Sequence, residues 1–155
     1  MMLLRQLLLF GLFTGFFSSV FAASPLQFED AWSPEAPPVA PVMAGYVKIS
    51  NTTQQTIAIT AAHCPDFNQV EIHDMQHKDG MMHMVKQDKL PIPAGKQVAL
   101  QPGGMHLMLI KPKRTIKAGD ILQVTFELSD GSSVAVPFTV KVRAMQGDHM
   151  HMQHH

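Results

Sequence analysis

Imidazole and thioether side chains recur in pairs, two residues apart, in three short segments of this 155-residue chain. The pairs are His73 with Met75, Met82 with Met84, and His106 with Met108. Because side chains alternate between the two faces of a strand, residues two apart share a face. In two of the segments the other face is apolar, through Val70 with Ile72 and through Met105, Leu107 and Leu109. Each strand would therefore present its pair away from the core.

These side chains suit a soft metal. Neutral imidazole binds several metals, whereas thioethers favour Cu(I). Two His and two Met make a neutral set, which would hold Cu(I) and still release it to a thiolate-rich acceptor. The competing interpretation is incidental: a Met on a strand is usually a flexible core residue, and His63, His77 and His83 are ordinary surface groups. The joint pattern favours a Cu(I) site.

The composition excludes several other classes of protein. There are 12 Met and 9 His but one Cys, and 12 basic residues balance 12 acidic ones. Zero formal charge argues against a nucleic-acid surface, and one Cys makes no disulfide framework, zinc finger or iron–sulfur cluster. A blue-copper site needs a Cys shortly before its last His, so Cys64 is interpreted as a small, partly buried residue. No nucleophile–base pair, carboxylate dyad or phosphate loop stands out, so we expect that the protein is not an enzyme.

The first 22 residues resemble a cleaved secretory signal peptide. Arg5 precedes an apolar run over residues 7–17, and small residues lead to Ala22. An uncleaved anchor is the alternative, but Gly, Ser and Thr interrupt the run, which is short for a membrane span. No Cys lies near the junction, which argues against a lipoprotein anchor. We expect a periplasmic protein, with no membrane anchor after cleavage, whose single domain covers residues 23–145.

The domain reads as a succession of short strands separated by Pro and Gly. The expected strands are residues 27–32, 43–50, 56–62, 69–75, 80–86, 97–100, 105–110, 121–128 and 134–142. The last two alternate apolar and polar residues around Asp130-Gly131, which is typical of a hairpin. Eight or nine strands at this spacing predict an all-β Greek-key sandwich or barrel.

The spacing of four metal-binding residues resembles the motif of the periplasmic copper chaperone family called PCu(A)C. The motif is His, ten residues, Met, twenty-one residues, His, one residue, Met, and it matches His73, Met84, His106 and Met108 without a gap. Residues 92–95 and 102–109 also resemble the family, as does Ala31-Trp32. The resemblance covers roughly residues 28–142.

The resemblance implies a cupredoxin-like β-sandwich and a function. Cu(I) would be bound by His73, Met84, His106 and Met108, with Met75 as an accessory ligand. The monomeric protein would deliver copper to the copper-centre subunit of cytochrome c oxidase or to its assembly factors. Two alternatives stay open: a periplasmic copper-buffering or resistance protein that sequesters the ion, and a structural or adhesive β-sandwich in which His and Met are incidental. Glu71 and Asp74 are interpreted as ordinary strand-face and turn residues.

The last ten residues, 146–155, predict a disordered tail rich in His and Met. Its candidate accessory ligands are His149, Met150, His151, Met152, His154 and His155. Closely spaced imidazoles in a flexible segment can chelate Cu(II), whereas the thioethers favour Cu(I). The alternatives are an expression tag and an exposed tail of no consequence.

Overall fold

The computed structural model describes residues 24–142, which form ten β-strands and no helix. The strands are β1 (Leu26–Pro34), β2 (Val42–Asn51), β3 (Ile57–His63), β4 (Phe67–Lys78), β5 (Met81–Gln87), β6 (Leu90–Ile92), β7 (Gln97–Leu100), β8 (His106–Pro112), β9 (Ile121–Leu128) and β10 (Ser133–Lys141). The all-β class is confirmed. The predicted signal peptide and the predicted tail lie outside the described residues. No helix in residues 24–142 is long and apolar enough to cross a membrane.

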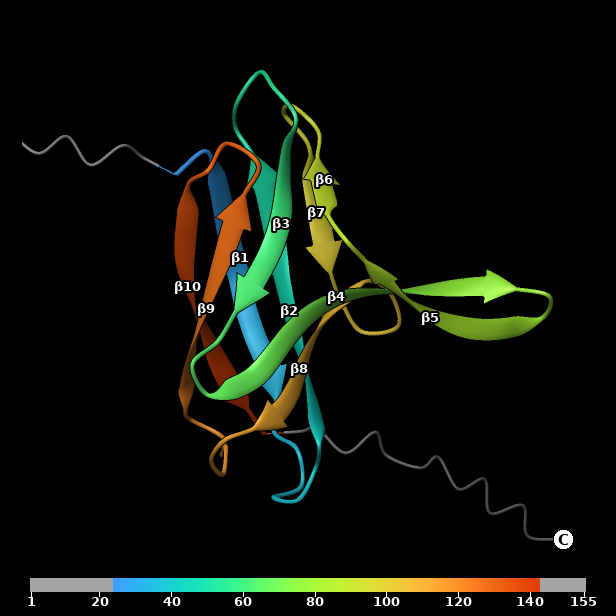
Figure 1. Ribbon diagram of the computed structural model, residues 1–155, viewed down its shortest axis with the longest axis vertical. Coiled ribbons are helices and arrows are strands. Elements are labelled where there is room, and N and C mark those ends of the chain that lie inside the picture. Colours follow the sequence, from blue (N-terminus) through green and yellow to red (C-terminus); the bar gives the residue numbers. More distant parts are fainter. Residues whose placement is uncertain (1–23, 143–155) are drawn as a thin grey trace, which may run out of the picture.

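The strands form one sheet that closes on itself. Along the sheet their order is β5-β4-β8-β2-β1-β10-β9-β3-β6, β7 pairs with β2, and an additional pairing joins β4 to β3 (Figure 1). The pairing of β1 with β10 is parallel, whereas the other pairings are antiparallel. The expected hairpin around Asp130-Gly131 is β9–β10, paired from Ser133↔Glu127 onward. The sequence pattern missed β6, a three-residue strand with a proline at its centre.

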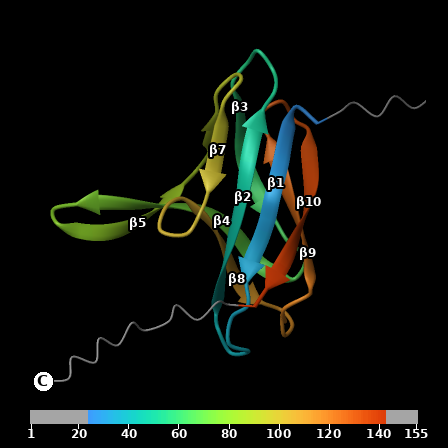
Figure 2. The ribbon, with the colours of Figure 1, turned by 180° about the vertical axis from the view of Figure 1, so that it is seen from behind.

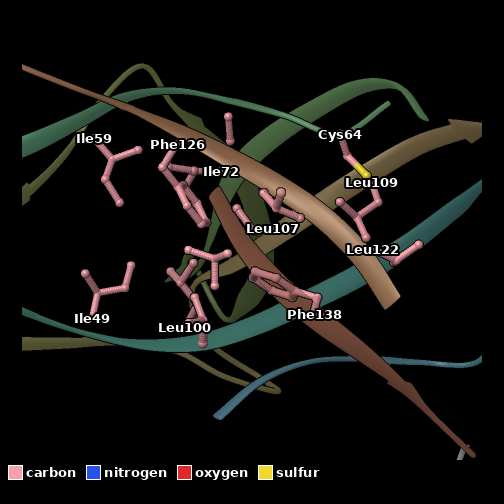
Figure 3. Close-up of a cluster of buried hydrophobic side chains, with 14 of the residues drawn as sticks. Ile49, Ile59, Cys64, Ile72, Leu100, Leu107, Leu109, Leu122, Phe126 and Phe138 are labelled. Atoms are coloured by element: carbon pink, nitrogen blue, oxygen red, sulfur yellow. The ribbon is translucent and has the colours of Figure 1, made fainter. Parts of the chain in front are cut away.

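The interior is filled by the apolar face of each strand. Leu107, Leu109 and Phe138 are fully buried, and Figure 3 shows them in one cluster with Cys64 and Ile72. Gly45 lies opposite Leu107 on β2, where a Cβ atom would lie 3.2 Å from the Leu107 Cβ. The glycine therefore lets β2 and β8 pack closely behind the polar face of β8.

The β4–β5 hairpin extends beyond the closed sheet as an arm. β8 pairs with β4 only as far as His73, and the rest of β4 pairs with β5 alone. Asp79 and Gly80 both have positive φ between the pair Lys78↔Met81, as a two-residue type I′ turn requires. Figures 1 and 2 show the arm projecting from the molecule in both views.

Candidate metal centre

Strand register brings the predicted ligands to one face of the β5-β4-β8 part of the sheet. His73 on β4 is opposite His106 on β8, and Met75 is opposite Met84 on β5. Met108 is opposite Glu71, two residues before His73. Directly opposed residues of antiparallel strands share a face, and diagonal neighbours about 7–8 Å apart are within reach of long side chains. His73, Met75, Met84, His106 and Met108 therefore share this face.

The two imidazoles are at a spacing that suits one metal ion. The ring centroids of His73 and His106 are 6.2 Å apart, and the ring planes are inclined by 31°. With metal–nitrogen bonds of about 2.0 Å, two imidazoles on one ion have centroids roughly 5 to 6.5 Å apart. The observed spacing falls within that range.

A carboxylate sets the tautomer of His73. The His73 Nε2–H donates to Glu71 Oε2 at 2.7 Å, and Lys86 Nζ donates to Glu71 Oε1 at 2.7 Å. The Lys86 ammonium and the His73 ring hold the pKa of the Glu71 carboxyl below its ordinary value. The charged carboxylate only accepts hydrogen bonds, so the neutral His73 ring carries its proton on Nε2 and its lone pair on Nδ1. Histidine ligands commonly donate their second nitrogen to a carboxylate in this way.

The Nδ1 atom of His73 is buried and has no hydrogen-bond partner. A buried polar atom without a partner costs free energy, on the order of 1–3 kcal/mol. A metal ion bound to this lone pair would remove that cost. The orphaned atom therefore fits a bound cation.

His106 is also fixed by a hydrogen bond through one ring nitrogen, but to a different partner. Its Nδ1–H donates to the carbonyl oxygen of Gly104 at 3.0 Å, which leaves Nε2 as the unprotonated nitrogen of the neutral ring. Both imidazoles are thus fixed through one nitrogen, with a lone pair left on the other.

The candidate ligands become more exposed to solvent from β4 toward β5. The side chain of His73 is 13% exposed, whereas Met84 is 49% exposed. His106 and Met108 are half-buried, and between them Leu107 points into the core. The imidazoles are therefore sheltered, and a thioether on the arm borders solvent.

The structure adds two residues that the sequence pattern did not assign to the site. Glu71 and Lys86 touch the site through hydrogen bonds, and the spacing of Glu71 two residues before His73 was the available signal. Asp74 lies within β4, opposite Val85, so its interpretation as a turn residue is wrong. The alternation places Asp74 on the face opposite the site.

Other candidates fall outside the site. Met81 and His83 are paired with Lys78 and Gln76, on the face of the arm opposite His73. Cys64 lies between β3 and β4, is 5% exposed and belongs to the core. In residues 24–142 no three His, Cys, Asp or Glu side chains gather as a metal site. The donors assembled here are imidazoles and thioethers.

The closed all-β sheet is the fold of PCuAC domains. A solution structure of CuI-DR1885 from Deinococcus radiodurans is 32% identical, with a TM-score of 0.60 over 72% of this chain and 74% of that one. The copper-bound PCuAC domain from PmoF2 has a TM-score of 0.66 at 17% identity, covering 79% of this chain and 97% of that one. The cupredoxin-like fold and the PCu(A)C resemblance are confirmed.

The chain belongs to the LpqE-like family, described as "Putative lipoprotein LpqE-like", whose model matches residues 26–140. A relative in Leifsonia xyli subsp. xyli, named "Putative lipoprotein Lxx21020", is 31% identical over 120 residues, which cover 77% of this chain and 71% of that protein.

Proposed function

We propose that the protein is an exported copper chaperone, not an enzyme, that binds one Cu(I) ion through His73, Met84, His106 and Met108. One observation carries the proposal: the buried, unpartnered Nδ1 of His73 lies on the face where register assembles these donors. Met75, opposite Met84, serves as the accessory ligand.

The donor set favours Cu(I) over other ions. Thioethers are soft ligands that bind Cu(I) well, and the imidazoles suit several metals. Support also comes from two structures named above, the copper-bound PCuAC domain from PmoF2 and CuI-DR1885. The four ligands are neutral, and the negative charge of Glu71 reaches the site through its hydrogen bond with His73.

The same donor set favours transfer. Cu(I) binds thiolates more strongly than thioethers, so an acceptor with reduced cysteines would withdraw the ion. We propose the copper-centre subunit of cytochrome c oxidase, or one of its assembly factors, as the acceptor. The half-exposed Met84 offers the position at which an acceptor thiolate first replaces a ligand.

The remaining parts of the proposal concern the ends of the chain. Residues 1–22 would direct export to the periplasm and be removed, leaving a monomer without an anchor. The tail residues 146–155 would capture Cu(II) through their imidazoles. Cu(II) binding that persists after removal of residues 148–155 would contradict the role of the tail.

Anaerobic titration of the full mature chain with Cu(I), against a competing chelator, tests the site. We expect one tightly held ion with sulfur and nitrogen ligands in X-ray absorption, and at least about tenfold weaker binding in Met108→Leu. Met105→Leu is the matched control, because Met105 directly precedes β8, which carries Met108, and packs against the core. Equal losses in both variants, or none in Met108→Leu, would contradict the ligand assignment.

A second candidate function, copper buffering, uses the same ligands. Mixing the Cu(I)-loaded protein with a reduced, cysteine-containing oxidase copper domain separates the two functions. Transfer of the ion supports the chaperone, whereas retention of the ion under reducing conditions supports sequestration.

A further inference from the structure

The face that carries the candidate metal centre continues along the arm to a second pair of soft donors. His77 on β4 is opposite Met82 on β5, and the His77 Nδ1 lies 2.7 Å from the Met82 Sδ. His77 follows His73 and Met75 at two-residue spacing, so all three share one face. The face therefore presents His73, then the pair Met75 and Met84, then the pair His77 and Met82.

Packing does not account for the outer pair. His77 is exposed, and Met82 is 50% exposed at the end of the arm, away from the core. The arm projects clear of the closed sheet in both views (Figures 1 and 2). A thioether is a weak hydrogen-bond acceptor, so its contact with His77 contributes little stability on an exposed hairpin.

We propose that His77 and Met82 form a second, exposed Cu(I) site at the end of the arm, from which the ion moves to and from the inner site through Met75 and Met84. The inference rests on the proposed binding of Cu(I) to the inner site, and it assigns the route by which that site is loaded and emptied.

The spacing of the donors suits such a route. Residues two apart on a strand are about 6.6 Å apart, and Met has three rotatable side-chain bonds. Imidazole and thiolate bonds to zinc are about 2.0–2.3 Å long, and bonds of roughly this length let a flexible Met75 or Met84 side chain bind an ion before its previous ligand leaves. Opening the His77–Met82 contact by about 1 Å admits an ion between them.

Each step exchanges one coordination bond and involves no redox change. Inward, a Cu–S bond to Met75 forms as the Cu–N bond to His77 breaks, and a Cu–S bond to Met84 forms as the Cu–S bond to Met82 breaks. A Cu–N bond to His73 then replaces the Cu–S bond to Met75, bonds to His106 and Met108 complete the inner site, and copper stays Cu(I) throughout. When the ion binds Nδ1 of His77, the proton on that atom passes to water and water protonates Nε2. The ring therefore stays neutral.

The opposite face of the arm supplies a matched control. Met81 and His83 are exposed residues of the same types on the same strand, paired with Lys78 and Gln76. The double variant His83→Gln/Met81→Leu removes an imidazole and a thioether without touching the proposed route, whereas His77→Gln/Met82→Leu removes the outer site.

The experiment is an anaerobic titration of the full mature chain, carrying ¹³C-methyl methionine, with Cu(I) supplied as its acetonitrile complex. We expect Met84 and Met108 signals to shift first and the Met82 signal to shift at higher Cu(I). In His77→Gln, Cu(I) binding at Met82 weakens about tenfold or more, whereas His83→Gln leaves the Met82 response unchanged. Transfer from the loaded inner site to a competing chelator becomes several times slower in His77→Gln/Met82→Leu and keeps its rate in His83→Gln/Met81→Leu.

Each other outcome overturns a defined part of the inference. A Met82 signal that does not shift at saturating Cu(I), while Met84 and Met108 respond, overturns the outer site and leaves the proposed function intact. Equal transfer rates in the two double variants overturn the route. Shifts at Met82 without shifts at Met84 and Met108 would contradict the proposed inner site instead.

Discussion

His73 and His106 lie directly opposite each other on β4 and β8, with their ring centroids 6.2 Å apart. The first belongs to the strand that forms the arm, and the second follows the loop after β7. Their pairing is the point at which two distant parts of the chain meet. Each ring is fixed by a hydrogen bond through one nitrogen, to Glu71 and to Gly104 respectively.

The hydrogen bond from His73 to Glu71 predicts a positioning role for the carboxylate. Glu71→Gln keeps an acceptor oxygen but removes the charge that favours the Nε2–H tautomer, so Cu(I) affinity should fall about 10- to 100-fold. Competition with a Cu(I) chelator measures the loss, and the melting temperature of the metal-free protein should change little.

Glu127→Gln is the control for this prediction. Glu127 Oε1 makes the same kind of contact with His63 Nε2, at 3.0 Å, on an exposed surface. The Glu127→Gln substitution should leave Cu(I) affinity unchanged. Parallel losses in the two variants would show that the effect comes from general charge and not from His73.

Leu107 connects the site to the core, because it is fully buried between His106 and Met108. Leu107→Ala should lower the free energy of unfolding by about 2–5 kcal/mol through lost burial and a cavity. Urea denaturation of the metal-free protein measures this cost. Val142→Ala, at a side chain that is 74% exposed, should change stability by less than about 0.5 kcal/mol. A similar small change in Leu107→Ala would contradict the packing described here.

The Cys64 thiol should react slowly and should not be needed for Cu(I) binding. The residue is 5% exposed, and burial raises the pKa of its thiol, so little reactive thiolate forms near neutral pH. We expect slow alkylation by iodoacetamide in the native protein and ordinary alkylation in denaturant. Cys64→Ala should bind Cu(I) with unchanged stoichiometry, and a lost equivalent would make the thiol a ligand after all.

Arg114 joins two loops through carboxylates. It donates to Asp66 Oδ1 and to Asp120 Oδ2, each at 2.7 Å, and the contact with Arg114 lowers the pKa of Asp120. A lowered carboxyl pKa means that the folded state favours the charged form. The resulting stability is present above the ordinary pKa of 3.8 and is lost as the pH falls through the lower, folded-state pKa.

Arg114→Met should therefore lower the melting temperature at pH 7, by on the order of a few degrees. The difference from the unsubstituted protein should shrink below about pH 4. Lys89→Met removes one positive charge from an exposed residue without an ion pair in the described chain, and should give no such pH-dependent difference. A constant difference down to pH 2 would contradict the ion-pair origin.

Alternation within a strand was readable from local sequence. Leu107 and Leu109 are buried and His106 is not, as a period of two predicts. The pairing of β4 with β8 was not readable, because its register depends on contacts between residues far apart in the chain. Glu71 lies two residues before His73 on the same strand, so that contact had a local signal. Its second partner, Lys86, meets it only when β4 and β5 align. The contact of His77 with Met82 spans only the two-residue turn at Asp79 and Gly80, so it had a local signal of the same kind as the Asp130-Gly131 hairpin.

The amino-acid sequence by itself determined the all-β class, the soft chemistry of the donors and the face of each strand on which they stand. These follow from residue type and from the two-residue period of an extended chain. Only the tertiary structure decided that β4 is shared between β5 and β8, that His73 keeps a buried nitrogen without a partner, and that the arm extends the donor face. The physical reason is that a strand leaves its hydrogen-bonding edges unsatisfied, and only the assembled sheet determines which strand satisfies each edge.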